Sequence, residues 1–124
     1  MVGPLIRKAA LDRVESYVSI AKEEGAKLVI GGDRASQFGK GFFHNITVFD
    51  DVDNSMRVAQ EEIFGPVGAV IGFDTDEEAV KIANDSRYGL YGGIETANSA
   101  KAFQMAKQMR TGGVVINGGL MRQN

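Results

Sequence analysis

The chain of 124 residues contains no cysteine, a single histidine and only two prolines. Without cysteine it cannot form a disulfide, a thiolate metal site or a cysteine nucleophile. The one histidine, His44, has no second imidazole with which to hold a transition metal, and its neighbours Phe42 and Phe43 favour a structural or surface role. We therefore expect neither a metal site nor a cysteine nucleophile within this chain.

Long hydrophobic runs and an excess of one charge are also missing. Lys and Arg number 14 against 16 Asp and Glu, so the formal net charge is -2. Such a balance offers no basic surface to nucleic acid or to an anionic membrane. No apolar run approaches the ~18 residues of a spanning helix, and Arg7 and Lys8 interrupt the first one. We expect a cytoplasmic protein without nucleic-acid or membrane partners.

The composition that is present is typical of a globular protein. Hydrophobic residues make up 44% of the chain and charged residues 24%, and the 16 glycines indicate many turns. The length matches one domain at most, so we expect a single domain over residues 1–124.

The first half of the chain predicts one long helix and two strands. Apolar spacing favours a helix over residues 5–24, with Pro4 in its first turn and Gly25 just past its end. Residues 28–30 and 42–49 are typical of strands. The apolar face of the helix contains Ala10, Val14, Tyr17, Val18 and Ala21.

The second half alternates apolar runs with amphipathic segments. Strands are predicted at residues 67–73, 93–96 and 114–116. Asp74 or Thr75 can cap the helix that follows, Thr75 with Glu78 has the spacing of a capping box, and Asn98 is typical of a second N-cap. This order predicts an α/β fold with three neighbouring parallel strands in one sheet. The covering helices present Val80 on the first and, on the second, the stripe Ala102, Phe103, Ala106 and Met109.

Glu61 and Glu62 are adjacent carboxylates. Neighbouring residues do not share a face of a helix or strand, so the two cannot flank one substrate bond as an acid and base pair. Local pattern favours an acidic turn in which one carboxylate caps a backbone amine. The nearby acidic run Asp50, Asp51 and Asp53 lacks the glycine and glutamate offsets of a calcium loop and is interpreted as a solvated turn.

The segment Glu61-Glu62-Ile63-Phe64-Gly65-Pro66-Val67 closely resembles a signature of the NAD(P)-dependent aldehyde dehydrogenase superfamily. Further segments resemble the family in the same order, among them Gly3-Pro4-Leu5-Ile6, Glu24-Gly25-Ala26-Lys27-Leu28, Ala83-Asn84-Asp85-Ser86, Tyr88-Gly89-Leu90 and Gly112-Gly113-Val114-Val115-Ile116-Asn117. The resemblance implies the later part of a catalytic domain, with an open, mostly parallel sheet and flanking helices.

By this resemblance, Glu62 hydrogen-bonds the nicotinamide ribose of NAD or NADP, and Phe64 packs beside the nicotinamide ring. A carboxylate can accept from both ribose hydroxyls, and an aromatic face restricts where the ring lies. The implied reaction oxidises an aldehyde to a carboxylic acid. Arg13 falls near a family position that approaches the adenosine ribose, but the looser match there assigns it no role.

The family's cysteine nucleophile, general-base glutamate and glycine-rich cofactor turn have no counterpart in this sequence, and neither has the stretch expected after Asn117. The resemblance therefore implies a fragment without a catalytic residue, and we expect a partial domain that is inactive by itself, binds the cofactor weakly or not at all, and forms a homo-oligomer. The alternative is a truncated, non-enzymatic α/β remnant that self-associates or binds a partner.

Overall fold

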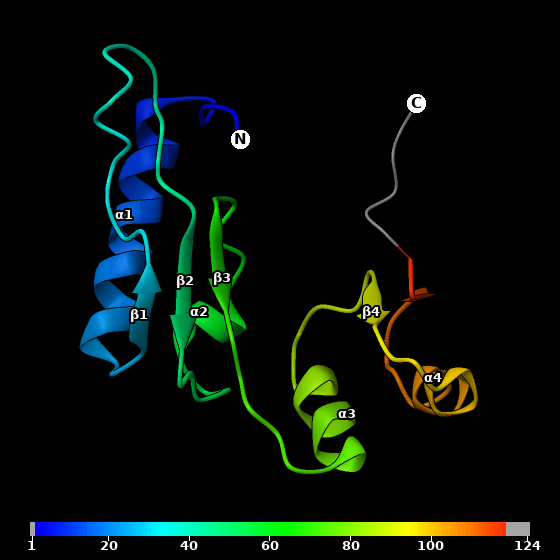
Figure 1. The fold of residues 1–124 in the computed structure, drawn as a ribbon. Coiled ribbons are helices and arrows are strands. Elements are labelled where there is room, and N and C mark those ends of the chain that lie inside the picture. The colour runs from blue at the N-terminus through cyan, green and yellow to red at the C-terminus, as the bar shows by residue number, and fades with distance from the viewer. Residues whose placement is uncertain (1, 119–124) are drawn as a thin grey trace. The chain divides into compact units, whose positions relative to one another are not determined.

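The structure, a computed structural model, describes residues 2–118. The chain divides into two compact units, Met1–Gly72 (unit 1) and Phe73–Asn124 (unit 2), and each is described here by itself (Figure 1). Among the described residues, no helix combines the length and the apolar character needed to cross a membrane.

Unit 1 consists of a long helix against a three-stranded sheet (Figure 1). Strand β2 lies in the centre, antiparallel to β1 and parallel to β3, with Thr47 opposite Val67. The elements are α1 (Lys8–Glu23), β1 (Lys27–Ile30), β2 (Thr47–Asp50), α2 (Arg57–Gln60) and β3 (Val67–Ala69).

The helix predicted over residues 5–24 is present but begins three residues late. Arg7, its N-cap, has an extended backbone with φ -161°, so Pro4 precedes the helix instead of lying in its first turn. Gly25 has φ +98°, a left-handed conformation that glycine adopts at low cost just past a helix end. The buried face contains Leu11, Val14, Tyr17, Val18 and Ala21.

The core of unit 1 lies between α1 and the sheet. Phe49, Val14 and Thr47 are its largest fully buried side chains. The Thr47 hydroxyl accepts a hydrogen bond from the Gly32 amide at 2.9 Å and donates one to the Asn45 carbonyl at 3.0 Å, so this buried polar group is satisfied.

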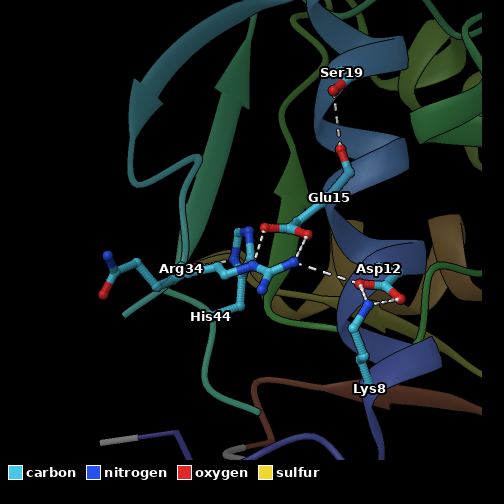
Figure 2. Close-up of polar contacts among 7 residues, drawn as sticks. Lys8, Asp12, Glu15, Ser19, Arg34 and His44 are labelled. Atoms are coloured by element: carbon cyan, nitrogen blue, oxygen red, sulfur yellow. Dashed lines mark hydrogen bonds and ion pairs between the residues drawn. The ribbon is translucent and has the colours of Figure 1, made fainter. Parts of the chain in front are cut away.

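An ion-pair cluster ties the segment after β1 to α1. Figure 2 shows the Arg34 guanidinium reaching Glu15 with two nitrogens and Asp12 with one, at 3.4 Å. Asp12 also accepts from Lys8 Nζ, at 2.6 and 2.8 Å. The hydrogen bond from Arg34 holds the pKa of the Glu15 carboxyl below its ordinary value of 4.5.

Unit 2 alternates helices and short strands. Strands β4 and β5 are parallel, with Gly92 opposite Val114. The predicted caps of both helices are confirmed: Thr75 Oγ1 accepts from the Glu78 amide at 3.1 Å, and Asn98 Oδ1 accepts from the Lys101 amide at 3.0 Å. The elements are α3 (Asp76–Asn84), β4 (Gly92–Ile94), α4 (Ser99–Ala106) and β5 (Val114–Ile116).

The α/β fold with mostly parallel pairing is confirmed, but the arrangement of three strands in one sheet is wrong. Strand β3 pairs with β2, whereas β4 pairs with β5 in a separate sheet. An apolar run indicates that a strand is buried, but it does not identify the strand that pairs with it. The predicted strands are also longer than the segments that pair. Of residues 67–73, only Val67–Ala69 form a strand, and near residues 42–49 the strand is Thr47–Asp50. Phe103, expected in a covering stripe, is 62% exposed.

Candidate functional site

The candidate site is the connection between α2 and β3, where the signature residues lie. Helix α2 has only four residues and no side-chain cap of its own. Instead, the Glu24 carboxylate at the end of α1 accepts a hydrogen bond from the Arg57 amide at 2.9 Å. A backbone donor at the start of α2 is thereby satisfied from a distant part of the sequence.

Glu61 is engaged with the protein. Its Oε2 accepts a hydrogen bond from the Tyr17 hydroxyl at 2.5 Å, and Arg57 donates to both of its oxygens at 2.9 and 3.1 Å. This fork-shaped, charge-assisted contact raises the pKa of Arg57 above its ordinary value. Glu61 therefore anchors the signature to both α1 and α2.

Glu62 has the opposite environment. Its side chain is exposed, and within residues 2–118 its carboxylate makes no hydrogen bond or ion pair, while its backbone carbonyl accepts one from Arg13 Nη2. The two adjacent carboxylates thus have different surroundings, as expected because neighbouring residues do not share a face of a helix or strand. The Glu62 carboxylate is the one available to a ligand.

Phe64 is held at the surface in an uncommon backbone conformation. Its φ is +56°, in the left-handed region that a bulky residue adopts at a cost, and its side chain is 73% exposed. Its neighbour Ile63 is buried in the core of unit 1. An exposed aromatic ring therefore stands beside an exposed carboxylate on a well-anchored segment.

Two hollows border this segment, and both are lined in part by Ile63 and Phe64. One, of about 490 Å³, lies toward residues before α1 and along its first turns, including Arg13. The other, of about 290 Å³, follows residues 61–65 and Val67. A larger hollow of about 620 Å³, lined by Phe38 and Phe43 among others, has no signature residue in its lining.

Two other residues considered in the sequence, His44 and Asp53, make contacts within the protein. His44 is buried, and since its Nδ1 lies 2.8 Å from the Asn45 carbonyl, that nitrogen is the donor. Asp53 accepts from the amide and hydroxyl of Ser55, the contact of a capped turn. In the described part of the chain, no three His, Cys, Asp or Glu side chains are grouped as metal ligands.

Sequence reasoning missed the residues that support the site. The spacing of Arg57 and Glu61, four residues apart, was a readable signal of a helical ion pair. The apolar periodicity of α1 places Tyr17 only on the buried face, although its hydroxyl reaches Glu61 across 44 positions of sequence. No local pattern indicates the contacts of Arg13 with Glu62 and Phe64.

Comparison with known proteins places this arrangement in a family. The sequence model of the aldehyde dehydrogenase family matches residues 1–124. Geranial dehydrogenase of Castellaniella defragrans is 48% identical over 118 residues, which are 95% of this chain and 24% of the relative. The chain therefore belongs to the aldehyde dehydrogenase family, as the resemblance predicts.

Solved structures agree. An aldehyde dehydrogenase of Mycobacterium tuberculosis complexed with NAD+ is 50% identical with a TM-score of 0.94, and the match covers 98% of this chain and 25% of that one. Betaine aldehyde dehydrogenase of Staphylococcus aureus in complex with NAD+ is 42% identical with a TM-score of 0.92, over 95% and 24% of the two chains. The chain spans about a quarter of the length of these relatives.

Proposed function

We propose that residues 61–65 contribute the nicotinamide end of an NAD(P) site in an enzyme that oxidises an aldehyde to a carboxylic acid. The observation that carries the proposal is the contrast between the two carboxylates: Glu61 is bound to Tyr17 and Arg57, whereas Glu62 is exposed beside the exposed ring of Phe64.

The residues present fit a nicotinamide ribose by their chemistry. An ionised carboxylate only accepts hydrogen bonds, and two neighbouring ribose hydroxyls are two donors, so Glu62 matches them. Phe64 offers an apolar face against which a flat ring is restricted. When bound, the dinucleotide supplies the hydride acceptor for aldehyde oxidation. The family match and the relatives solved with NAD+ support this assignment.

Aldehyde oxidation by this route needs a thiolate that adds to the aldehyde, and the chain has no cysteine. We therefore propose that the isolated chain is inactive. Its affinity for NAD or NADP is weak, because Glu62 and Phe64 address only one end of a dinucleotide.

Titration of the isotope-labelled chain with millimolar NAD, followed by amide chemical shifts, tests the site directly. We expect shifts confined to residues 61–65 and the neighbouring start of α1, reduced in Glu62→Gln. The matched control is Glu23→Gln, an exposed glutamate of α1. Shifts that persist in Glu62→Gln contradict the proposal. If the chain shows no shifts, a second experiment decides. The matching glutamate of a full-length relative is replaced by glutamine, and an unchanged cofactor KM and kcat in that variant contradict the role of Glu62.

A second function, self-association of a non-enzymatic domain, is supported by the large apolar side chains at the surface, such as Ile6 at 90% and Leu90 at 85% exposed. Association between copies would remove such apolar surface from water. We propose that the chain forms homo-oligomers in the cytoplasm. Light scattering that finds a strict monomer at high concentration contradicts the oligomer.

A further inference from the structure

The conformation of Phe64 needs support from outside the signature. A bulky residue in the left-handed region is held only where its surroundings determine it, and the Phe64 ring has little burial to fix it. The anchor of Glu61 lies three residues earlier and constrains the start of the signature. The support for the segment from Glu62 to Gly65 comes from two adjacent residues of α1, Arg13 and Val14.

Arg13 contacts the signature in two ways. Its Nη2 donates a hydrogen bond to the Glu62 carbonyl, the acceptor just before Ile63. Its guanidinium carbon lies 5.7 Å from the centroid of the Phe64 ring and 5.6 Å from that of Tyr17. A planar guanidinium can donate in its plane while an aromatic ring lies over its face, which lysine cannot reproduce.

Val14 constrains the segment on the other side of Phe64. A Cβ added to Gly65 would lie 2.3 Å from Val14 Cγ2, so backbone and side chain approach as closely as glycine allows. Val14 is itself fully buried in the core of unit 1. Arg13 and Val14 therefore fix residues 62 and 65 to the same turn of one helix, with Phe64 between them.

We propose that Arg13 is a positioning residue for the cofactor site, acting through the Glu62 carbonyl and the Phe64 ring. The inference rests on the proposed function. It assigns the Arg13 guanidinium to protein groups and leaves the Glu62 carboxylate and the exposed part of the Phe64 ring for the ligand. Arg13 keeps both residues in a prepared geometry, so that ligand binding does not have to order them.

The absence of tryptophan from the chain gives a direct test. In a Phe64→Trp variant, the single indole reports the order and exposure of position 64. Adding Arg13→Met should lower the anisotropy of that indole, with the circular dichroism and the unfolding midpoint unchanged. Acrylamide quenching should change little because position 64 is already 73% exposed. Loss of an exposed cation–π contact should lower the ratio of held to released indole about two- to fivefold, and anisotropy reports that ratio. Arg13→Lys should restore only part of the order, because it supplies a donor without the planar stack.

The matched control is Arg87→Met, because Arg87 lies 5.7 Å from the Tyr88 ring, a contact of the same kind in unit 2. It should leave the indole at position 64 unaffected. Indole order that is the same with arginine and methionine at position 13 overturns the inference, as does full rescue by lysine.

A binding arm separates this inference from the proposed function. Nicotinamide mononucleotide is titrated against the natural chain and Arg13→Met, with amide shifts of residues 61–65 as the readout. Weaker binding by Arg13→Met at an unchanged unfolding midpoint supports both proposals. Equal binding overturns the positioning role and leaves the site intact. If the natural chain does not bind nicotinamide mononucleotide, the glutamine variant of the full-length relative decides the proposed site, while the indole readout still decides whether Arg13 orders Phe64.

Discussion

Units 1 and 2 bury their apolar side chains to different extents. Unit 1 has a continuous core in which Val14 and Phe49 are fully buried between a long helix and a sheet. In unit 2, the buried apolar side chains within the described residues are Val80, Ile94 and Ala102, while Phe103 faces solvent. The signature is attached to the better-packed of the two.

Unit 2 depends more on polar contacts between side chains and backbone. Asn84 accepts from the Arg110 amide at 2.6 Å and donates to the Gln108 carbonyl at 2.8 Å. Asn117 makes a reciprocal pair with the backbone of Thr96, both at 2.8 Å. Such bonds are worth less net than a packed core, since each replaces a bond to water. The comparison implies that the chain's stability resides mainly in unit 1.

The largest expected effect is on the core of unit 1. Phe49→Ala removes a fully buried ring and should cost unit 1 about 3–5 kcal/mol. Val80→Ala in unit 2 should cost about 1–2 kcal/mol, because a smaller side chain is lost from a thinner core. Hydrogen exchange resolved by residue measures both. Equal losses of protection in the two units would contradict the comparison.

The next effect concerns the attachment of the signature to α1. Gly65→Ala places a methyl group against the buried Val14 and should destabilise unit 1 by about 1–3 kcal/mol. Gly68→Ala is the matched control, because a Cβ there meets nothing within 4 Å. A combined Val14→Ala and Gly65→Ala variant should lose less than the sum of the single changes. Additive losses, measured by denaturant unfolding, would show that the two residues do not pack against each other.

The parts of this fold that sequence predicts are those specified by nearby residues. The apolar stripe of α1, the glycine past its end and the caps at Thr75 and Asn98 each depend on a few consecutive positions. Helix α2 escaped prediction because four residues are too few for a periodic pattern, and its first amide is satisfied from Glu24, 33 positions away.

The candidate site, too, is predictable where it depends on nearby residues and not where it depends on distant ones. The seven signature residues propose Glu62 and Phe64 as site residues by family resemblance, and local backbone geometry predicts different surroundings for Glu61 and Glu62. The groups that support them, Tyr17 and Arg13, lie on α1, where periodicity reports only which face is buried. Strand partners are likewise non-local, so the order of apolar runs along the chain does not predict that β3 pairs with β2.

Helix capping gives a smaller and more local comparison. Thr75→Ala removes the hydroxyl that accepts from the Glu78 amide and should cost α3 about 1 kcal/mol. Arg7→Ala should have almost no effect on α1, since Arg7 makes no side-chain cap and the buried face of this helix stabilises it. Hydrogen exchange of the first-turn amides distinguishes the two. Loss of protection in α1 equal to that in α3 would mean that α1 also depends on its first turn.

The smallest expected effect is the pH dependence of the Arg34 cluster. Glu15 has a pKa below its ordinary 4.5 because Arg34 donates hydrogen bonds to its ionised form. A carboxyl whose pKa is lowered on folding stabilises the folded chain above the unfolded pKa, and this contribution disappears as the pH falls through the folded pKa.

Glu15→Gln should therefore be slightly less stable than the natural chain at pH 7, and the difference should shrink as the pH falls below 4.5. Added salt should reduce it at pH 7, since the pair is partly exposed. The control is Glu23→Gln on the same helix. Protection of amides in residues 31–45 should follow the pH difference while unit 2 amides do not, and a difference that grows toward low pH would contradict the ion pair as its cause.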